Sequence, residues 1–95
     1  MPLFVLTCVD RPGGLALRMS TREAHFAYAR SLPGVVRLGG PLLDDKGEMI
    51  GSLIVIEAPD IAAARRFNAE DPYTRAGLFE RVDVAPWRVT FGAIA

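Results

Sequence analysis

The chain contains a single histidine, His25, and this side chain is the strongest candidate for proton-transfer chemistry. An imidazole ordinarily gains and loses a proton near neutral pH, which suits a general acid or a general base. A lone histidine on a helix is also a common structural residue, so its presence alone assigns no role. A carboxylate that orients the ring would favour the catalytic interpretation.

Asp71 is the carboxylate predicted to meet His25, although the two residues lie far apart in the sequence. It stands before Pro72-Tyr73, where the second predicted helix ends. A loop at the end of one helix can reach the side of a neighbouring helix, and a carboxylate there would fix the tautomer of the imidazole. The alternative is that Asp71 only accepts backbone N–H groups, because Asp-Pro is common in turns.

Three further polar residues are candidate substrate ligands: Arg22, Ser52 and Tyr73. Arg22 lies one helical turn before His25 and can bind a substrate carboxylate, or it is an ordinary surface arginine. Ser52 interrupts an apolar strand and either faces a ligand or makes a local hydrogen bond. Tyr73 is either a wall and hydrogen-bond donor of the pocket or a half-buried packing residue.

Composition excludes several other classes of function. The chain has 95 residues, 51% of them hydrophobic, and its 11 basic and 11 acidic side chains give zero formal net charge. This balance argues against nucleic acid and anionic membranes as partners. One cysteine, Cys8, and one histidine allow no cysteine-rich or multi-histidine metal site, and we predict no metal and no cofactor. We expect a cytoplasmic protein, since no leader or membrane-spanning segment is visible.

The order of predicted elements is β-α-β-β-α-β. A short helical turn is expected at residues 15–19, and a capping box, Ser20 with Glu23, predicts that the first helix begins at Thr21. The predicted apolar side of this helix consists of Ala24, Ala27, Tyr28, Ser31 and Leu32. Asp60 is the expected N-cap of the second helix. The order predicts one α+β domain, residues 1–95, with a ferredoxin-like βαββαβ fold and a four-stranded antiparallel sheet. The predicted strands cover residues 2–9, 35–43, 49–58 and 78–91, and the two helices cover 21–32 and 61–70.

The third predicted strand does not alternate apolar with polar residues. From Met49 to Ile56 it is apolar on both faces, as strands buried on both sides are. Two helices cover only one face of a four-stranded sheet, and large exposed apolar patches are uncommon on monomers. We therefore predict a homodimer whose sheets pack face to face, that is, a dimeric α+β barrel.

Five short motifs occur in order along the chain. They are Arg22-Glu23-Ala24-His25, Gly39-Gly40-Pro41, Gly51-Ser52, Asp71-Pro72-Tyr73 followed by Gly77-Leu78-Phe79, and Val84-Ala85-Pro86-Trp87. Taken together, they resemble the YciI-like (YCII-related) family of small dimeric α+β barrel proteins over essentially the whole chain. The resemblance implies a ferredoxin-like fold, a homodimer and an active site centred on a histidine–aspartate pair, which corresponds to His25 and Asp71. Most members have no established substrate, and some related proteins resemble lyases or dehalogenase-type enzymes of aromatic breakdown.

The leading hypothesis is an enzyme of lyase, isomerase or hydrolase type that acts on a small carboxylated or phenolic molecule. His25 would be the general acid/base and Asp71 the group that orients it. The alternative is a non-catalytic module that binds or senses an unknown small molecule. A third interpretation, an amino-terminal Pro2 acting as a base after methionine removal, competes with a plain strand beginning there.

Overall fold

The computed structural model describes residues 1–94. Its elements follow the predicted β-α-β-β-α-β order, with one additional short helix before the last strand. The bounds are β1 (Leu3–Asp10), α1 (Leu15–Arg30), β2 (Val36–Leu43), β3 (Met49–Glu57), α2 (Ile61–Glu70), α3 (Pro72–Arg75) and β4 (Phe79–Trp87).

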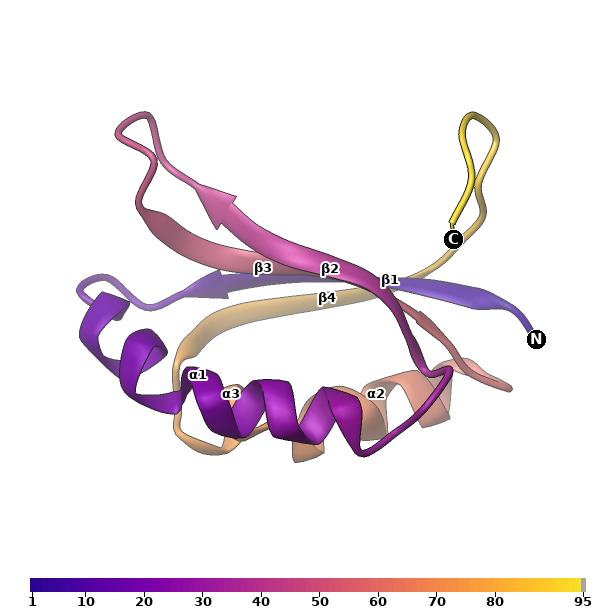
Figure 1. The fold of residues 1–95 in the computed structure, drawn as a ribbon, viewed down its shortest axis with the longest axis horizontal. Helices are drawn as coiled ribbons and strands as arrows, with labels where there is room; N and C mark the ends of the chain where they lie inside the picture. The colour runs from indigo at the N-terminus through magenta and orange to yellow at the C-terminus, as the bar shows by residue number, and fades with distance from the viewer. Residues whose placement is uncertain (95) are drawn as a thin grey trace.

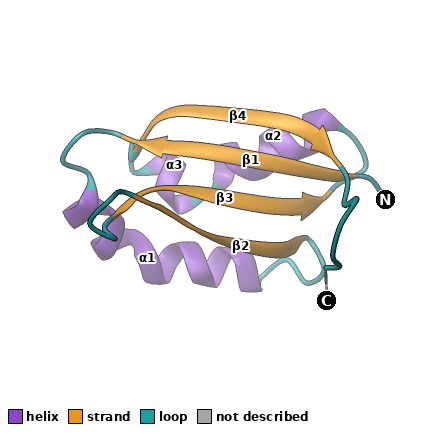
Figure 2. Ribbon diagram, turned by 90° about the horizontal axis from the view of Figure 1, so that it is seen from above, coloured by secondary structure: helices purple, strands orange, loops and turns teal. Residues whose placement is uncertain are grey.

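The four strands form one antiparallel sheet in the order β2-β3-β1-β4, which confirms the ferredoxin-like prediction. All three helices lie on one side of this sheet (Figures 1 and 2). Side chains alternate along β1, so Phe4, Leu6 and Cys8 point to the helices and are buried, whereas Leu3 and Val5 point to the other face and are half-buried. The helix face of the sheet therefore forms the core, and the opposite face has no helix over it.

Helix α1 is one continuous helix, so the predicted break before Thr21 is wrong. Residues 15–30 contain neither glycine nor proline, and Leu15-Ala16-Leu17 are good helix formers that start the helix early. Ser20 lies inside the helix, where its hydroxyl donates to the carbonyl oxygen of Leu17 at 3.1 Å. The predicted capping box does not form, because the Ser20 hydroxyl makes this local bond instead.

The inward face of the first helix agrees only in part with the prediction. Tyr28 and Leu32 pack on the hydrophobic core as predicted. Ala24, Ala27 and Ser31 are exposed instead, and Arg18, which lay outside the predicted helix, is buried. Tyr28 donates its hydroxyl to the carbonyl oxygen of Phe67 in α2 at 2.8 Å, which ties the two helices together. The helix is thus rotated so that Arg18 and Tyr28, rather than Ala24 and Ala27, face the sheet.

One aspartate caps the start of α2, and a second aspartate forms the junction between α2 and α3. Asp60 caps α2 as predicted, accepting the N–H of Ala63 at 2.8 Å. Asp71 ends α2 in an extended conformation and caps α3, accepting the N–H of Tyr73 at 2.9 Å. Pro72 fits the first position of α3, where a backbone N–H has no partner. This junction holds the Asp71 carboxylate at a fixed point beneath the sheet.

Strand β4 ends at Trp87, short of the predicted Phe91. Pro86 lies within the strand and pairs with Phe4 of β1. The sheet tolerates this proline because β4 is an edge strand that pairs only with β1. Among the helices of residues 1–94, none is long and apolar enough to cross a bilayer.

Candidate active site

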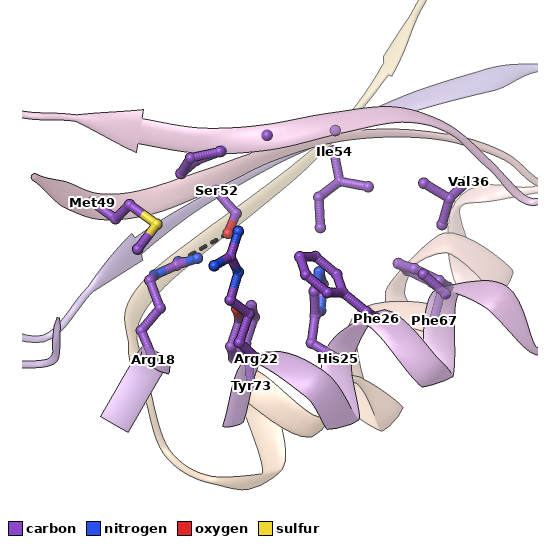
Figure 3. A pocket seen from close by; sticks show the side chains of 14 residues that line it. Arg18, Arg22, His25, Phe26, Val36, Met49, Ser52, Ile54, Phe67 and Tyr73 are labelled. Atoms are coloured by element: carbon purple, nitrogen blue, oxygen red, sulfur yellow. Dashed lines mark hydrogen bonds between the residues drawn. The ribbon is translucent and has the colours of Figure 1, made fainter. Parts of the chain in front are cut away.

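A cavity of about 170 Å³ opens between α1 and the sheet face that the helices cover (Figure 3). Its size suits one substituted six-membered ring, since a cavity of roughly 150 Å³ can hold benzene. The polar lining residues are Arg18, Arg22, His25, Ser52 and Tyr73, and the remainder are Phe26, Ala29, Val36, Gly39, Gly40, Pro41, Met49, Ile54 and Phe67.

His25 and Asp71, far apart in the sequence, are in contact in the fold. Nδ1 of His25 lies 3.0 Å from both carboxylate oxygens of Asp71. The Asp71 side chain is 1% exposed and that of His25 is 14% exposed. An ionised carboxylate only accepts hydrogen bonds, so Nδ1 is the nitrogen that donates. In the neutral ring, Nε2 then keeps its lone pair, and His25 lines the cavity with that nitrogen on the ring edge opposite Asp71.

Tyr73 holds the imidazole from its flat side. The two rings stack with their centroids 4.2 Å apart and their planes 18° from parallel. Tyr73 is buried, and burial raises the pKa of its hydroxyl above the ordinary value, so the phenol stays protonated at neutral pH. Tyr73, a predicted substrate ligand, therefore lies in the cavity wall, where its ring restricts rotation of the His25 imidazole.

Sequence reasoning missed the most deeply buried cation of the site, Arg18, and its partner Asp10. Arg18 is 3% exposed and makes a two-point ion pair, with Nε and Nη2 each 2.8 Å from one oxygen of Asp10. Burial lowers the pKa of Arg18, but the hydrogen bond and charge of Asp10 outweigh it, and the net pKa lies above the ordinary value. The guanidinium is therefore a permanent cation.

Ser52 lies where its strand position predicts, on the helix face of β3 opposite Cys8 of β1. Its hydroxyl oxygen accepts from Nη2 of Arg18 at 2.9 Å, the bond drawn in Figure 3. The neighbouring Gly51 has a separate role. A side chain at that position would collide with the backbone carbonyl oxygen of Cys8, so the Gly51-Ser52 motif combines close strand packing with a polar group in the cavity.

Arg22 is exposed to solvent, and its side chain on α1 forms part of the cavity lining. Its guanidinium carbon is 5.1 Å from the ring centre of Phe26. Within residues 1–94 it makes no ion pair with a carboxylate, unlike Arg18. Arg18, Arg22 and His25 are spaced by four and then three residues, which places them on one face of α1. That spacing was visible in the sequence, but the helix predicted to begin at Thr21 left Arg18 outside it.

The arrangement favours a small anion with an apolar body. Cationic and proton-carrying groups line one part of the cavity. The nearby carboxylates are already paired, Asp10 with Arg18 and Asp71 with His25. The other walls are mainly apolar. Among the described residues, no cluster of three His, Cys, Asp or Glu side chains could hold a metal ion.

The fold and this site define a ferredoxin-like α+β protein with a helix-to-sheet cavity, and comparisons with known proteins identify the family. The model of the YCII-related domain matches residues 2–88. Protein YciI of Escherichia coli O6:H1 is 33% identical over 97 residues, which cover 94% of this chain and 99% of that protein. The chain therefore belongs to the YCII-related family, as the sequence motifs predicted.

Solved structures agree with the family and the fold. The 5-chloro-2-hydroxyhydroquinone dehydrochlorinase of Burkholderia phenoliruptrix AC1100, in complex with 2,5-dihydroxybenzoquinone, superposes with a TM-score of 0.82. It is 36% identical, and the match covers 90% of this chain and 93% of that chain. An antibiotic biosynthesis monooxygenase matches with a TM-score of 0.59 over 95% and 99% of the two chains, but at 16% identity this likeness concerns the fold alone.

Proposed function

We propose that this protein is an enzyme that removes a proton from a small, planar phenolic or carboxylated molecule, with His25 as the general base. The observation that carries the proposal is the buried Asp71 carboxylate, which holds Nδ1 of His25 at 3.0 Å while the ring lines the cavity. Proton transfer by one positioned side chain contributes roughly 10²–10⁴-fold to a rate. Isomerisation, hydrolysis and elimination all use such a step.

The similar dehydrochlorinase favours elimination among these reactions. In such a step Nε2 of His25 takes a proton from the substrate. The electron pair left behind forms a new double bond, and the leaving group, such as chloride, departs with its bonding pair. Asp71 stabilises the imidazolium that forms, and water then removes its proton. Arg22, Ser52 and Tyr73 bind the substrate in this proposal.

The test is chloride release from chlorinated hydroxyhydroquinones and halophenols, with lactones and enol acids as probes of the other reactions. Wild-type protein should turn over at least one of these classes, and His25→Ala should lose about 10²-fold or more of that rate. Asp60→Ala, a change of similar size far from the cavity, is the matched control. Turnover that survives in His25→Ala refutes the role of His25. Saturable binding by the wild type without any product favours a non-catalytic binding module instead.

We also propose a homodimer formed through the sheet face that no helix covers. On that face Val5 and Leu53 are half-buried and Leu38 is 45% exposed, which makes an apolar surface suited to a second copy. Light scattering should give twice the chain mass at micromolar concentration, and Leu53→Arg should give the monomer mass. A monomeric wild type contradicts the proposal.

A further inference from the structure

One nitrogen of Arg18, Nη1, takes no part in the hydrogen bonds to Asp10 and Ser52. Those three bonds within residues 1–94 use Nε and both hydrogens of Nη2, which leaves both hydrogens of Nη1 available. Within the same residues no side-chain nitrogen or oxygen is both sealed from solvent and unpaired. Nη1 is therefore not sealed from solvent, and since Arg18 lines the cavity, the cavity is the space it reaches.

The hydroxyls of Ser52 and Tyr73 are available in the same way. Ser52 accepts from Arg18, and no bond formed by its own hydroxyl hydrogen occurs within the described residues. The hydroxyl of Tyr73 lies within reach of a hydrogen bond from the Arg18 guanidinium, which opposes the rise in the Tyr73 pKa that burial causes, and its own hydrogen remains to be donated. The guanidinium carbon of Arg18 lies 4.7 Å from the centre of the Tyr73 ring. Arg18, Ser52 and Tyr73, here called the donor cluster, thus offer N–H and O–H groups to one part of the cavity.

We propose that the donor cluster is an oxyanion site and that the enzyme's substrates are enols or phenols whose ionised oxygen binds there. The inference rests on the proposed function, because His25 would supply the base at the other end of the same molecule. When His25 takes a proton from an sp³ carbon of the keto tautomer, the electron pair of the broken C–H bond moves through the conjugated system to the oxygen held by Arg18, which becomes the enolate or phenolate oxygen. Donors fixed in advance at the place where negative charge develops stabilise the transition state most effectively.

The dimensions agree with a single ring spanning the two groups. Tyr73 contacts both, with Arg18 4.7 Å and the His25 ring 4.2 Å from its ring centre, so Arg18 and His25 are at most about 9 Å apart. Figure 3 shows Arg18 and His25 on either side of Tyr73, below β3. A substituted six-membered ring also matches the cavity volume of about 170 Å³.

A purely structural role explains Arg18 less well. Asp10 already neutralises its charge, and a buried guanidinium with unpaired N–H groups is unfavourable unless water or a ligand accepts from them. Selectivity in this site therefore comes from directed donors, not from net charge. The exposed Arg22 would instead contribute a general attraction that salt weakens.

The experiment uses calorimetry to compare two probes that share one quinone ring and differ in the groups on two of its oxygens. The probe 2,5-dihydroxybenzoquinone carries acidic hydroxyls, whereas 2,5-dimethoxybenzoquinone cannot ionise. Wild-type protein should bind the dihydroxy probe at least about tenfold more tightly, since a hydrogen bond to a charged group has roughly this effect. Tyr73→Phe, Ser52→Ala and Arg18→Lys should each remove much of that preference and leave the dimethoxy probe unchanged. Tyr28→Phe is the matched control, because Tyr28 does not line the cavity and its hydroxyl bonds only the backbone carbonyl oxygen of Phe67.

Several results overturn the inference. The inference is wrong if the wild type does not bind the dihydroxy probe. It is also wrong if the Tyr73→Phe and Ser52→Ala variants are folded and keep the full preference for that probe. Loss of the preference only in Arg22→Gln would assign the anion to Arg22. Thermal melting checks that each variant is folded, and the two hydroxyl deletions remain informative if Arg18→Lys does not fold. The expected probe selectivity with no turnover on any substrate would refute the proposed catalysis but retain the oxyanion site.

Discussion

Replacing Asp71 with asparagine tests the histidine–aspartate geometry most directly. The carboxylate accepts the backbone N–H of Tyr73 at 2.9 Å as well as Nδ1 of His25 at 3.0 Å. In the variant the amide oxygen must keep facing the Tyr73 N–H, because the amide nitrogen cannot accept from it. The amide NH₂ then occupies the Oδ2 position, which is as close to Nδ1 of His25 as Oδ1 is, at 3.0 Å. Two facing N–H groups at that distance would repel each other, so Nδ1 accepts from the NH₂. The imidazole proton consequently moves to Nε2, the nitrogen proposed as the base.

The expected loss of turnover is about 10²–10⁴-fold, the range that a general base contributes, because Nε2 no longer has a free lone pair in the neutral ring. Nitrogen-15 NMR of the single imidazole, at a pH where the ring is neutral, reports the tautomer directly. The wild type should show the proton on Nδ1 and Asp71→Asn should show it on Nε2. Only the His25 ring contributes imidazole signals, so assignment needs no further mutants.

Asp60→Asn is the matched control for this substitution. Asp60 is also a helix cap, but it bonds Ala63 and has no contact with His25. Asparagine and aspartate cap helices about equally well, so neither tautomer nor turnover should change. The reasoning is refuted if Asp71→Asn keeps the Nδ1–H tautomer, or if its turnover stays within about tenfold of the wild type while the protein is folded.

Two further predictions concern residues in the strands of the sheet. Burial raises the pKa of the Cys8 thiol to about 12, so the thiolate is scarce below that pH and the native thiol should not react with a disulfide reagent at pH 8, but should react fully in denaturant. Rapid reaction of the native protein contradicts this. Gly51→Ala should lower the free energy of unfolding by about 1–3 kcal/mol in urea titrations, because its side chain meets the carbonyl oxygen of Cys8. Gly40→Ala, with open space around it, is the control, and equal stability of the two variants would contradict the argument.

Much of the fold was predictable because its signals are local. The Asp60 cap and the Asp-Pro break each depend on neighbouring residues in the chain, and both are present in the structure. Short motifs likewise identified the family. His25 and Asp71 were named as a pair because helices of this fold pack side by side, although their catalytic role remains a proposal.

The start and the facing of α1 were not predictable by the same means. Ser20 with Glu23 has the spacing of a capping box, but the residues before Ser20 are equally good helix formers. The local pattern therefore fits two start positions for the helix. Alanines are small enough to lie on either face of a helix. Only contact with the sheet decides that Ala24 and Ala27 face solvent while Arg18 is buried.

The sequence by itself determined the order of the elements, the family and the acid/base pair of candidate residues. Tertiary structure alone decided that Arg18 enters the cavity, because its burial requires Asp10 on β1 and Ser52 on β3 at 2.8–2.9 Å. The spacing of residues within α1 does not predict those partners. A buried charge is stable only where other groups supply its hydrogen bonds. For Arg18 these groups lie on distant segments of the chain, which meet only when the helix packs on the sheet.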